Sequence, residues 1–513
     1  MESRMYAKAK DIEDYLQNAP KKPYISCEYM HAMGNSLGGM EKYIELEDQY
    51  EKYQGGFIWD YIDQAISHTN DFGEKVLGYG GDFDDRNTDY NFCGDGIVFA
   101  NRMPSPKADE VKYQYQDIIL KVDESGVSIR SKRLFKDTSD LIFKYQATQG
   151  KEVIREGAFE AIVKPQEEIH VPIDFGTFHP GEVILTVSAH LKEQCLWADQ
   201  GFEVAFGQCV LGRYNDMPYV EEPLVVIPGD GDLGVKCQDF EVLFSQEGLS
   251  SLKYRNKEYM IRGPRPVFMR ATTDNERGYA HHFTSNVWNG ASNAQALTNM
   301  NYHIAEDLHE VSITYEYTVL LQPRVRVELT YYVRSPGIVR VKYHYYGQPH
   351  LPEVPLFGTL FTLSHKLDHF SYLGRGPHEN YVDRKKGSRI GFFESTVKDN
   401  LTPYLKPQAC GNRTDVREVT LLDHDEEGLR FTMVDAPFEF TALPFSWQMI
   451  DATLHQYELP ERSYYTYLTI MNKQMGVGGD DSWGAPVLDE YCLKAEDDQE
   501  YIFDIMPIHQ EKD

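Results

Sequence analysis

Pro23-Tyr-Ile-Ser-Cys-Glu-Tyr-Met-His-Ala-Met-Gly-Asn35 is the stretch around which the rest of this 513-residue sequence is organised. It starts with a short apolar run over residues 24–27, which predicts a β-strand, and Gly34 ends the pattern. Glu28 lies at the end of this strand. A buried parallel strand that presents a carboxylate at its C-terminal end is typical of a catalytic (β/α) barrel. A glutamate in this place is often only solvated or paired in a salt bridge, so the strand alone does not assign a function.

The next segment predicts a helix and a second strand. Residues 36–53 repeat apolar side chains on one helical face, at Leu37, Met40 and Ile44. Residues 54–64, Gln-Gly-Gly-Phe-Ile-Trp-Asp-Tyr-Ile-Asp-Gln, then predict a strand that ends on an aromatic residue and two acids. The order is strand, helix, strand.

Residues 4–17, before the first of these strands, predict an amphipathic helix. Met5, Ile12 and Leu16 fall roughly on one of its faces. A closed (β/α) barrel needs eight strands, and only about two are recognisable before the pattern changes. We therefore expect the chain to begin inside a barrel domain.

Composition and charge exclude several classes of protein. The net charge is −29 and the sequence pI is near 5.0, which disfavours binding to nucleic acid or to anionic membranes. The seven cysteines are scattered without a CxxC pair, so we expect free thiols and neither a disulfide framework nor a zinc site. No apolar run approaches the ~18 residues of a membrane span, and no export signal is visible. These features predict a cytoplasmic protein.

The rest of the chain is rich in strands. Residues 118–212 contain six or seven short strands, which predict an immunoglobulin-like β-sandwich that serves as a structural spacer. Residues 213–224 are rich in proline and acids and predict a linker. Residues 225–513 alternate apolar and polar side chains almost without a helix, and need a large two-sheet sandwich.

Several strings carry a resemblance to a known family. Cys27-Glu-Tyr-x-His-Ala-Met-Gly-Asn35, followed by Gly55-Gly-Phe-Ile-Trp-Asp60, resembles the end of the catalytic barrel of glycoside hydrolase family 2, and especially of the large bacterial β-galactosidases that cleave lactose. The further matches are Arg270-Ala-Thr-Thr-Asp-Asn-Glu276, Leu373-Gly-Arg-Gly-Pro-His-Glu-Asn-Tyr-Val-Asp-Arg384 and Gly478-Gly-Asp-Asp-Ser-Trp483. The resemblance covers essentially the whole chain.

The resemblance implies a multi-domain, mainly β architecture. Residues 1–117 would be the C-terminal part of a TIM barrel, with its last two strands. Residues 118–212 would be the immunoglobulin-like sandwich, joined by the linker over residues 213–224 to the last domain. Residues 225–513 would form a large galactose-mutarotase-like β-sandwich of the β-galactosidase small-chain type, also described as domain 5.

The resemblance also assigns the catalytic carboxylates. Retaining glycosidases use two carboxyl groups roughly 5–5.5 Å apart, a nucleophile and an acid/base. Glu28 matches the nucleophile. In the family the acid/base Glu closes an Asn-Glu dipeptide upstream, after a strand that ends in Trp-Gly or Trp-Ser, and this motif is absent here. Asn275-Glu276 and Glu379-Asn380 lack that strand context. The magnesium ligands of the family are also upstream, so none is assigned.

Four residues match sugar-binding positions of the family: His31, Trp59, Asp95 and Trp483. His31 would hydrogen-bond a sugar hydroxyl, although by itself it could be a turn or core histidine. Trp59 would be a stacking platform for the galactose face, although a strand tryptophan is more often core. Trp483 resembles a tryptophan that a distant loop lends to the aglycone side, so the last domain would have to fold back over the barrel.

Two loops rich in glycine and aspartate follow the second strand. By themselves, residues 78–85 and 91–102 predict turns, and the resemblance makes them walls of the active site. Phe92 and Asp95 fall where the family binds sodium through a backbone carbonyl and a side-chain oxygen. Many relatives have Asn in place of Asp95, but a carboxylate is still a hard oxygen ligand and suits a cation.

The expected function is retaining hydrolysis of terminal β-D-galactose residues, as in lactose, with a galactoside as substrate. Because no acid/base Glu is found, we expect activity only with a complementary N-terminal chain; a homo-oligomer is another possible assembly. The alternatives are a non-catalytic carbohydrate-binding or scaffold subunit and an inert truncated product. Neither nucleic acid nor a membrane is an expected partner.

Overall fold

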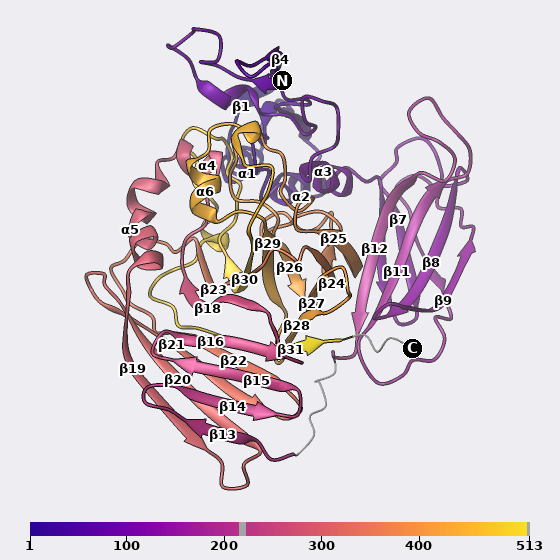
Figure 1. Ribbon diagram of the computed structural model, residues 1–513. Coiled ribbons are helices and arrows are strands. Elements are labelled where there is room, and N and C mark those ends of the chain that lie inside the picture. The colour runs from indigo at the N-terminus through magenta and orange to yellow at the C-terminus, as the bar shows by residue number, and fades with distance from the viewer. Residues whose placement is uncertain (215–221, 510–513) are drawn as a thin grey trace.

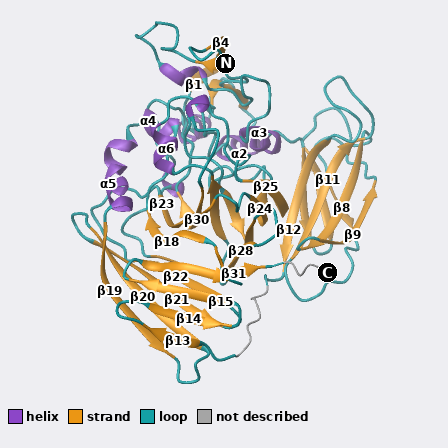
Figure 2. Ribbon diagram, viewed as in Figure 1, coloured by secondary structure: helices purple, strands orange, loops and turns teal. Residues whose placement is uncertain are grey.

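The computed structural model describes residues 1–214 and 222–509. Residues 215–221 of the predicted linker lie outside the described part. The chain is mainly β, and its helices gather in the upper half of the view in Figure 2. Three regions follow one another along the chain: a small parallel sheet, a β-sandwich to its right and a large sandwich below (Figure 1).

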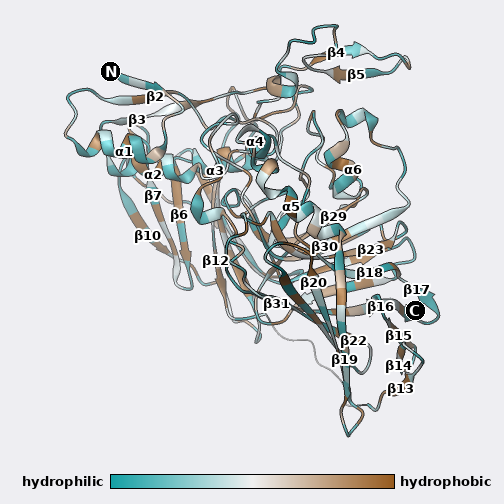
Figure 3. Ribbon diagram, turned by 90° about the vertical axis from the view of Figure 1, so that its left-hand side faces the viewer, coloured by the Kyte–Doolittle hydropathy of each residue, from teal (hydrophilic) through white to brown (hydrophobic). Residues whose placement is uncertain are grey.

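The first region is a parallel sheet of three strands with two helices on one face. The sheet order is β1-β2-β3. In chain order the elements are β1 (Glu2–Met5), α1 (Ala9–Gln17), β2 (Tyr24–Tyr29), α2 (Glu41–Gln49) and β3 (Tyr53–Ile58). Side chains of both helices and of β2 and β3 share one buried cluster, and Figure 3 shows this region at an outer corner of the molecule. This is the β-α-β-α-β order of a barrel fragment.

Two expectations for this region were wrong. The helix predicted over residues 4–17 begins only at Ala9, and residues 2–5 form a third barrel strand. Glu-Ser-Arg-Met has no apolar alternation; it is a strand because its backbone pairs with β2, with Glu2 opposite Tyr24. The helix predicted over residues 36–53 is shorter, because Leu37 adopts a φ of +69° and packs its side chain in the core from a loop.

Between β3 and the sandwich the chain builds loops and short elements. These are the hairpin β4 (Ile66–Thr69) and β5 (Lys75–Gly78), the 3-10 helix η1 (Tyr90–Cys93) and α3 (Lys107–Gln114). The hairpin projects from the top of the molecule in Figure 1.

The second region is a sandwich of two antiparallel sheets, ordered β10-β7-β6 and β12-β11-β8-β9. Its core takes alternate side chains from both sheets, such as Ile129 and Val187. The strands are β6 (Ile118–Asp123), β7 (Gly126–Ser131), β8 (Leu141–Gln149), β9 (Glu152–Phe159), β10 (Glu168–Pro172), β11 (Val183–Leu191) and β12 (Glu203–Leu211).

The third region places a nine-stranded sheet, β19-β20-β21-β22-β31-β28-β27-β24-β25, against two five-stranded sheets, β13-β14-β15-β16-β17 and β18-β23-β30-β29-β26. The first strands are β13 (Val225–Pro228), β14 (Leu233–Cys237), β15 (Phe240–Ser245), β16 (Gly248–Tyr254), β17 (Lys257–Glu258), β18 (Met260–Val267), β19 (Gln295–Ile304), β20 (Glu310–Val319), β21 (Val325–Arg334) and β22 (Ile338–Tyr345). The remaining strands are β23 (Leu356–Ser364), β24 (His369–Gly376), β25 (Arg389–Thr396), β26 (Arg413–Val416), β27 (Glu418–Leu422), β28 (Gly428–Met433), β29 (Phe438–Leu443), β30 (Tyr465–Gln474) and β31 (Gln499–Ile508).

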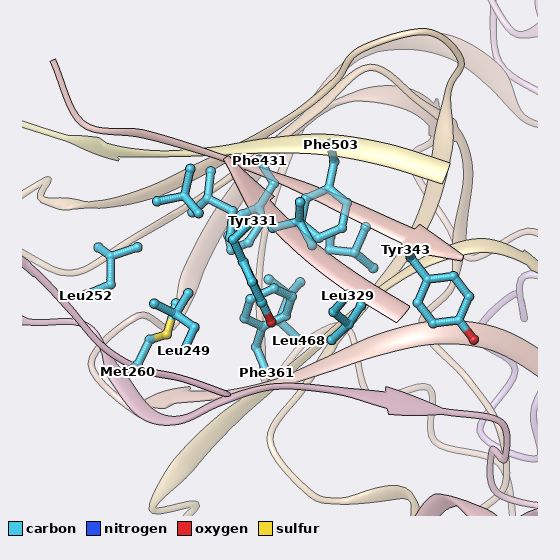
Figure 4. Close-up of a cluster of buried hydrophobic side chains, with 14 of the residues drawn as sticks. Leu249, Leu252, Met260, Leu329, Tyr331, Tyr343, Phe361, Phe431, Leu468 and Phe503 are labelled. Carbon is cyan, nitrogen blue, oxygen red and sulfur yellow. The ribbon is translucent and has the colours of Figure 1, made fainter. Parts of the chain in front are cut away.

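One hydrophobic core joins these three sheets. Leu252 of β16, Tyr331 of β21 and Phe361 of β23 meet in it (Figure 4). The region also carries α4 (Asp274–Gly278), α5 (His281–Asn293), α6 (Trp447–Ala452), η2 (Gln456–Glu458) and η3 (Asp489–Tyr491). The expectation that residues 225–513 contain almost no helix was wrong for α5, which buries Trp288 completely. Loops between these strands run up to the parallel sheet and build the site.

Candidate active site

Glu28 lies near the C-terminal end of β2, the central strand of the parallel sheet, and is half-buried. Its backbone carbonyl accepts a hydrogen bond from the amide of Tyr6, at 2.9 Å. The Tyr6 phenol faces the Glu28 carboxylate. Burial raises the pKa of Tyr6 well above its usual value, and the neighbouring carboxylate of Glu28 raises it further. A phenol that stays protonated can donate to the carboxylate. Tyr6 was not identified from the sequence.

Trp59 follows β3, one strand further along the sheet. Its carbonyl accepts from the amide of Ala32 at 2.7 Å, which holds the turn after Glu28 against the end of β3. Its indole Nε1 donates to Asp95 Oδ2 at 3.0 Å. The Trp59 side chain is 40% exposed. Part of the ring surface is therefore open to a ligand, as a stacking platform requires.

His31 is at the centre of the cluster and is only 2% exposed. Its Nδ1 lies 3.0 Å from Ser482 Oγ, and its Nε2 lies 3.8 Å from Asp95 Oδ2. Burial, helped by the charge of Lys107, lowers the pKa of His31 to about 4. At neutral pH the imidazole is therefore uncharged, with one donor and one acceptor nitrogen.

Asp95 is buried, and burial raises its pKa to about 6. Its Oδ2 accepts from Trp59, whereas its Oδ1 has no hydrogen-bond partner. A buried carboxylate oxygen without a partner is unfavourable. The backbone of Phe92 lies three residues before it, in η1, and the Phe92 ring packs on His31 with 5.3 Å between centroids. This donor set fits a cation with oxygen ligands.

Trp483 comes from the loop after β30, in the last tenth of the chain. Its ring packs edge-on against Tyr6 and His31, with centroid distances of 4.6 and 5.2 Å. The indole remains 47% exposed. The structure therefore brings Glu28, His31, Trp59, Asp95 and Trp483 into one cluster, to which Tyr6 and Ser482 are added.

Loops of the large sandwich hold the turn that follows Glu28. Gln408 accepts the amide of Asn35 at 3.1 Å through its Oε1, and donates to Asp274 Oδ2 at 2.7 Å through its Nε2. Asp274 Oδ1 accepts from the side chain of Asn91, the neighbour of Phe92, at 3.0 Å. A single polar chain thus ties the turn after Glu28 to the loop that carries Asp95.

The other two matched strings close around the next residues. Arg384 donates to the carbonyl of Ser36, and Asp383 Oδ2 accepts the amides of Val477 and Gly478, both at 2.9 Å. The amide of Gly39 donates to the Asp383 carbonyl at 2.8 Å. All three strings that match in the last region therefore pack against residues 34–39.

The glutamates of Asn275-Glu276 and Glu379-Asn380 form ion pairs and hydrogen bonds within the last region. Glu276 is buried, pairs with Arg270 at 2.8 Å and closes the capping box of α4 with Thr273. Glu379 is buried and accepts from Tyr404 and Thr402. Their roles are in the packing of the last region, in agreement with their lack of the acid/base motif.

The described residues contain no helix long and apolar enough to cross a bilayer.

The family models that match this chain describe parts of family 2 glycosyl hydrolases and of β-galactosidase. Residues 1–120 match the model for the TIM-barrel domain of family 2 glycosyl hydrolases, residues 127–212 match domain 4 of β-galactosidase, and residues 236–505 match the β-galactosidase small chain. A solved galactose mutarotase-related enzyme from Lactobacillus acidophilus covers 54% of this chain, and 97% of its own, with a TM-score of 0.31 at 12% identity.

Curated relatives match along nearly the whole chain. The β-galactosidase of Halalkalibacterium halodurans is 46% identical over 516 residues, which are 98% of this chain and 50% of the relative. The β-galactosidase of Streptococcus thermophilus is 40% identical over 533 residues, 99% of this chain and 52% of the relative. The chain thus spans about half the length of these relatives. It belongs to the β-galactosidases of glycoside hydrolase family 2, as a C-terminal part of such an enzyme.

Proposed function

We propose that this chain supplies the nucleophile and much of the sugar-binding wall of a retaining β-galactosidase. The substrate would be a galactoside with a terminal β-D-galactose, as in lactose. The observation that carries the proposal is the single cluster of Glu28, His31 and Trp59, from the first region, with Trp483, from a distant loop of the last region. The relatives named β-galactosidase supply the substrate class.

In this proposal the Glu28 carboxylate attacks the anomeric carbon and forms a covalent glycosyl intermediate, which water then hydrolyses. The Tyr6 phenol would donate to Glu28 and orient it. Neutral His31 offers a hydrogen bond to a sugar hydroxyl, and the open part of the Trp59 ring packs on the apolar face of galactose. Trp483 packs against His31 from a loop of the last region and stays 47% exposed, and it would contact the leaving group.

We further propose that Asp95 and the carbonyl of Phe92 hold a sodium ion. The unpaired Oδ1 of Asp95 and the buried position of this carboxylate support this assignment. A bound cation would supply positive charge that orients the hydroxymethyl group of the sugar. It would also keep Asp95 ionised, against the burial that raises its pKa.

The partner we propose is a polypeptide that adds parallel strands to this sheet. Both β1 and β3 are edge strands. Cys27 is exposed, and Phe57 is 63% exposed on the same side, away from α1 and α2. Parallel sheets are normally covered on both faces. The partner would also carry the acid/base Glu and the magnesium ligands known in the family. All seven cysteines are free, which suits assembly in a reducing cytoplasm.

The proposal is tested by measuring hydrolysis of a chromogenic galactoside with the purified chain, alone and with the complementary fragment. The chain alone should be almost inactive, because loss of general acid catalysis typically costs about 10²–10⁴-fold in rate. The mixture should be active, and the same mixture with Glu28→Gln should not.

Two results would contradict this proposal. Strong turnover by the pure chain would mean that its acid/base residue lies within the chain. A folded complement that binds without restoring turnover would favour a non-catalytic carbohydrate-binding or scaffold subunit.

A further inference from the structure

Lys107, at the start of α3, is a buried charge that the proposed chemistry does not use. Its side chain is 1% exposed. Burial of an ammonium group costs several kcal/mol unless hydrogen bonds and opposite charges offset the loss of water. A lysine in this place therefore needs a local explanation.

The Lys107 ammonium donates to two backbone carbonyls of the turn that carries His31. The acceptors are the carbonyls of Ala32, at 2.6 Å, and Gly34, at 2.8 Å. This turn is irregular, with positive φ at Met30 and at Gly34. Its carbonyls thus have no place in a strand or helix ladder, and a buried carbonyl needs a donor. Lys107 supplies that donor to both.

The same turn is the junction of the three segments that bear the site residues. The amide of Ala32 donates to the Trp59 carbonyl at 2.7 Å, and the amide of Gly34 donates to the carbonyl of Gly94, next to Asp95, at 3.0 Å. Movement of the turn would therefore move His31 relative to both Trp59 and Asp95. Lys107 holds the carbonyls of Ala32 and Gly34, the same two residues whose amides make these links.

The electrostatic surroundings keep Lys107 charged at neutral pH. Burial lowers its pKa to about 8, while Asp63 and then Asp274 act in the opposite direction. The Tyr404 ring lies 5.8 Å from the ammonium nitrogen. All three hydrogens of an ammonium group can donate, so the charged form can make both observed bonds at once.

We propose that Lys107 is a positioning residue for the sugar-binding site: it fixes the turn over residues 31–34 and so sets the place of His31 relative to Glu28, Trp59 and Asp95. This inference rests on the proposed function, since it assigns Lys107 a part in that reaction. Lys107 acts through the turn and does not touch the substrate.

The kinetic test is Lys107→Met in the assembled enzyme, with the active sites counted by a fluorinated galactoside that traps the nucleophile. The turnover per counted site should fall about 10–100-fold, as expected when reacting groups are displaced by up to an ångström. Lys112→Met, five residues further along α3 and more exposed, is the matched control and should keep its turnover. Fewer sites with unchanged turnover per site would overturn the proposal, because it would reduce Lys107 to a purely structural residue.

The second variant, Lys107→Ala, tests the need for the ammonium group even if Lys107→Met folds poorly. Added n-propylammonium should restore turnover per counted site, and neutral 1-propanol should not. Equal rescue by both would overturn the assignment, because filling the space would then suffice.

Hydrogen exchange in the chain by itself separates this inference from the proposed function. In Lys107→Met the amides of Ala32 and Gly34 should exchange at least about tenfold faster, because the turn that contains both amides is no longer fixed by the ammonium group and opens more often. The amide of Tyr24, bonded to the carbonyl of Lys52, is the internal control. Unchanged exchange at residues 32 and 34 overturns the positioning role. An inactive wild-type assembly instead contradicts the proposed function, and the exchange result still shows whether Lys107 holds the turn.

Discussion

Gln408 donates to the carboxylate of Asp274 at 2.7 Å. Through this pair the large sandwich binds two segments of the candidate site, the turn after Glu28 and the loop that carries Asp95. Asn35 binds Gln408 on one side, and Asn91 binds Asp274 on the other. Both members of the pair are buried. Buried polar networks of this kind resist local rearrangement, because breaking one bond leaves other groups without partners. The shape of the site therefore depends on a region far from the barrel in sequence.

Gly34→Ala should destabilise the chain, because Gly34 fits directly against this pair. A Cβ on Gly34 would lie 2.2 Å from Asp274 Oδ2 and 2.6 Å from Gln408 Nε2, and its φ is +55°. We expect a loss of about 2–5 kcal/mol, the range for overpacking combined with left-handed strain. The measurement is the midpoint of thermal unfolding.

Gly73→Ala is the matched control for that prediction. Its φ is +81°, but a Cβ there would meet no atom within 4 Å. Only the backbone strain of about 1–2 kcal/mol remains. Equal unfolding midpoints for the two variants would show that Asp274 and Gln408 move aside freely.

Glu28→Gln should remove turnover by several orders of magnitude in the assembled enzyme, because an amide cannot act as the nucleophile. A fluorinated galactoside should label Glu28 in the unsubstituted enzyme, and peptide mapping by mass spectrometry would locate the label. A label on any other carboxylate would refute the assignment.

Asp95→Ala should abolish the sodium dependence of KM in the assembled enzyme, because it removes the carboxylate oxygen that has no other partner. Asp95→Asn keeps a side-chain oxygen and should retain the dependence at higher sodium concentrations. KM measured against sodium concentration, at constant ionic strength, tests both variants. Retained dependence in Asp95→Ala would place the cation elsewhere.

Glu439 should make stability depend on pH. It is buried in β29, and burial raises its pKa from 4.5 to about 7, although the side chain of Asn412 donates to it at 2.9 Å. Between these values the folded state binds more protons than the unfolded state, so stability falls as pH rises. The loss by pH 8 should be about 3 kcal/mol.

Glu439→Gln mimics the protonated side chain and should remove this part of the pH dependence. The comparison is the free energy of unfolding of both proteins at pH 5 and pH 8. The variant should gain stability relative to the unsubstituted protein as pH rises. Parallel pH profiles would contradict a raised pKa in the folded state.

The local elements of the site could be predicted from sequence. The strand with Glu28 is an apolar run and is present as β2. The second strand, predicted over residues 54–64, is present as β3 but ends at Ile58, before Trp59. Residues 2–5 gave no such signal, because β1 is polar and owes its conformation to pairing with β2. Tyr6 was missed for the same reason, since it follows a strand that has no pattern of its own.

The contacts between regions could not be predicted from local patterns. Asp274, Asp383 and Ser482 lie within strings that matched a family, but nothing in their spacing indicates that they meet at residues 31–39. Lys107 gave no signal either, because a lysine at the start of a helix is ordinarily exposed. Its burial depends on the turn, the loop of Asp63 and Tyr404 packing around it together.

The contact between His31 and Ser482 spans 451 residues of chain. At a ribosomal elongation speed of about 5–20 residues per second, these 451 residues take about 20–90 s to synthesise. Throughout this interval the nascent parallel sheet presents two open edges, to which other strands can pair. Synthesis therefore delivers Glu28 long before Ser482 and the other late residues that hold its surroundings, and slower codons near the 3′ end of the message would lengthen the time for which the turn after Glu28 lacks these contacts.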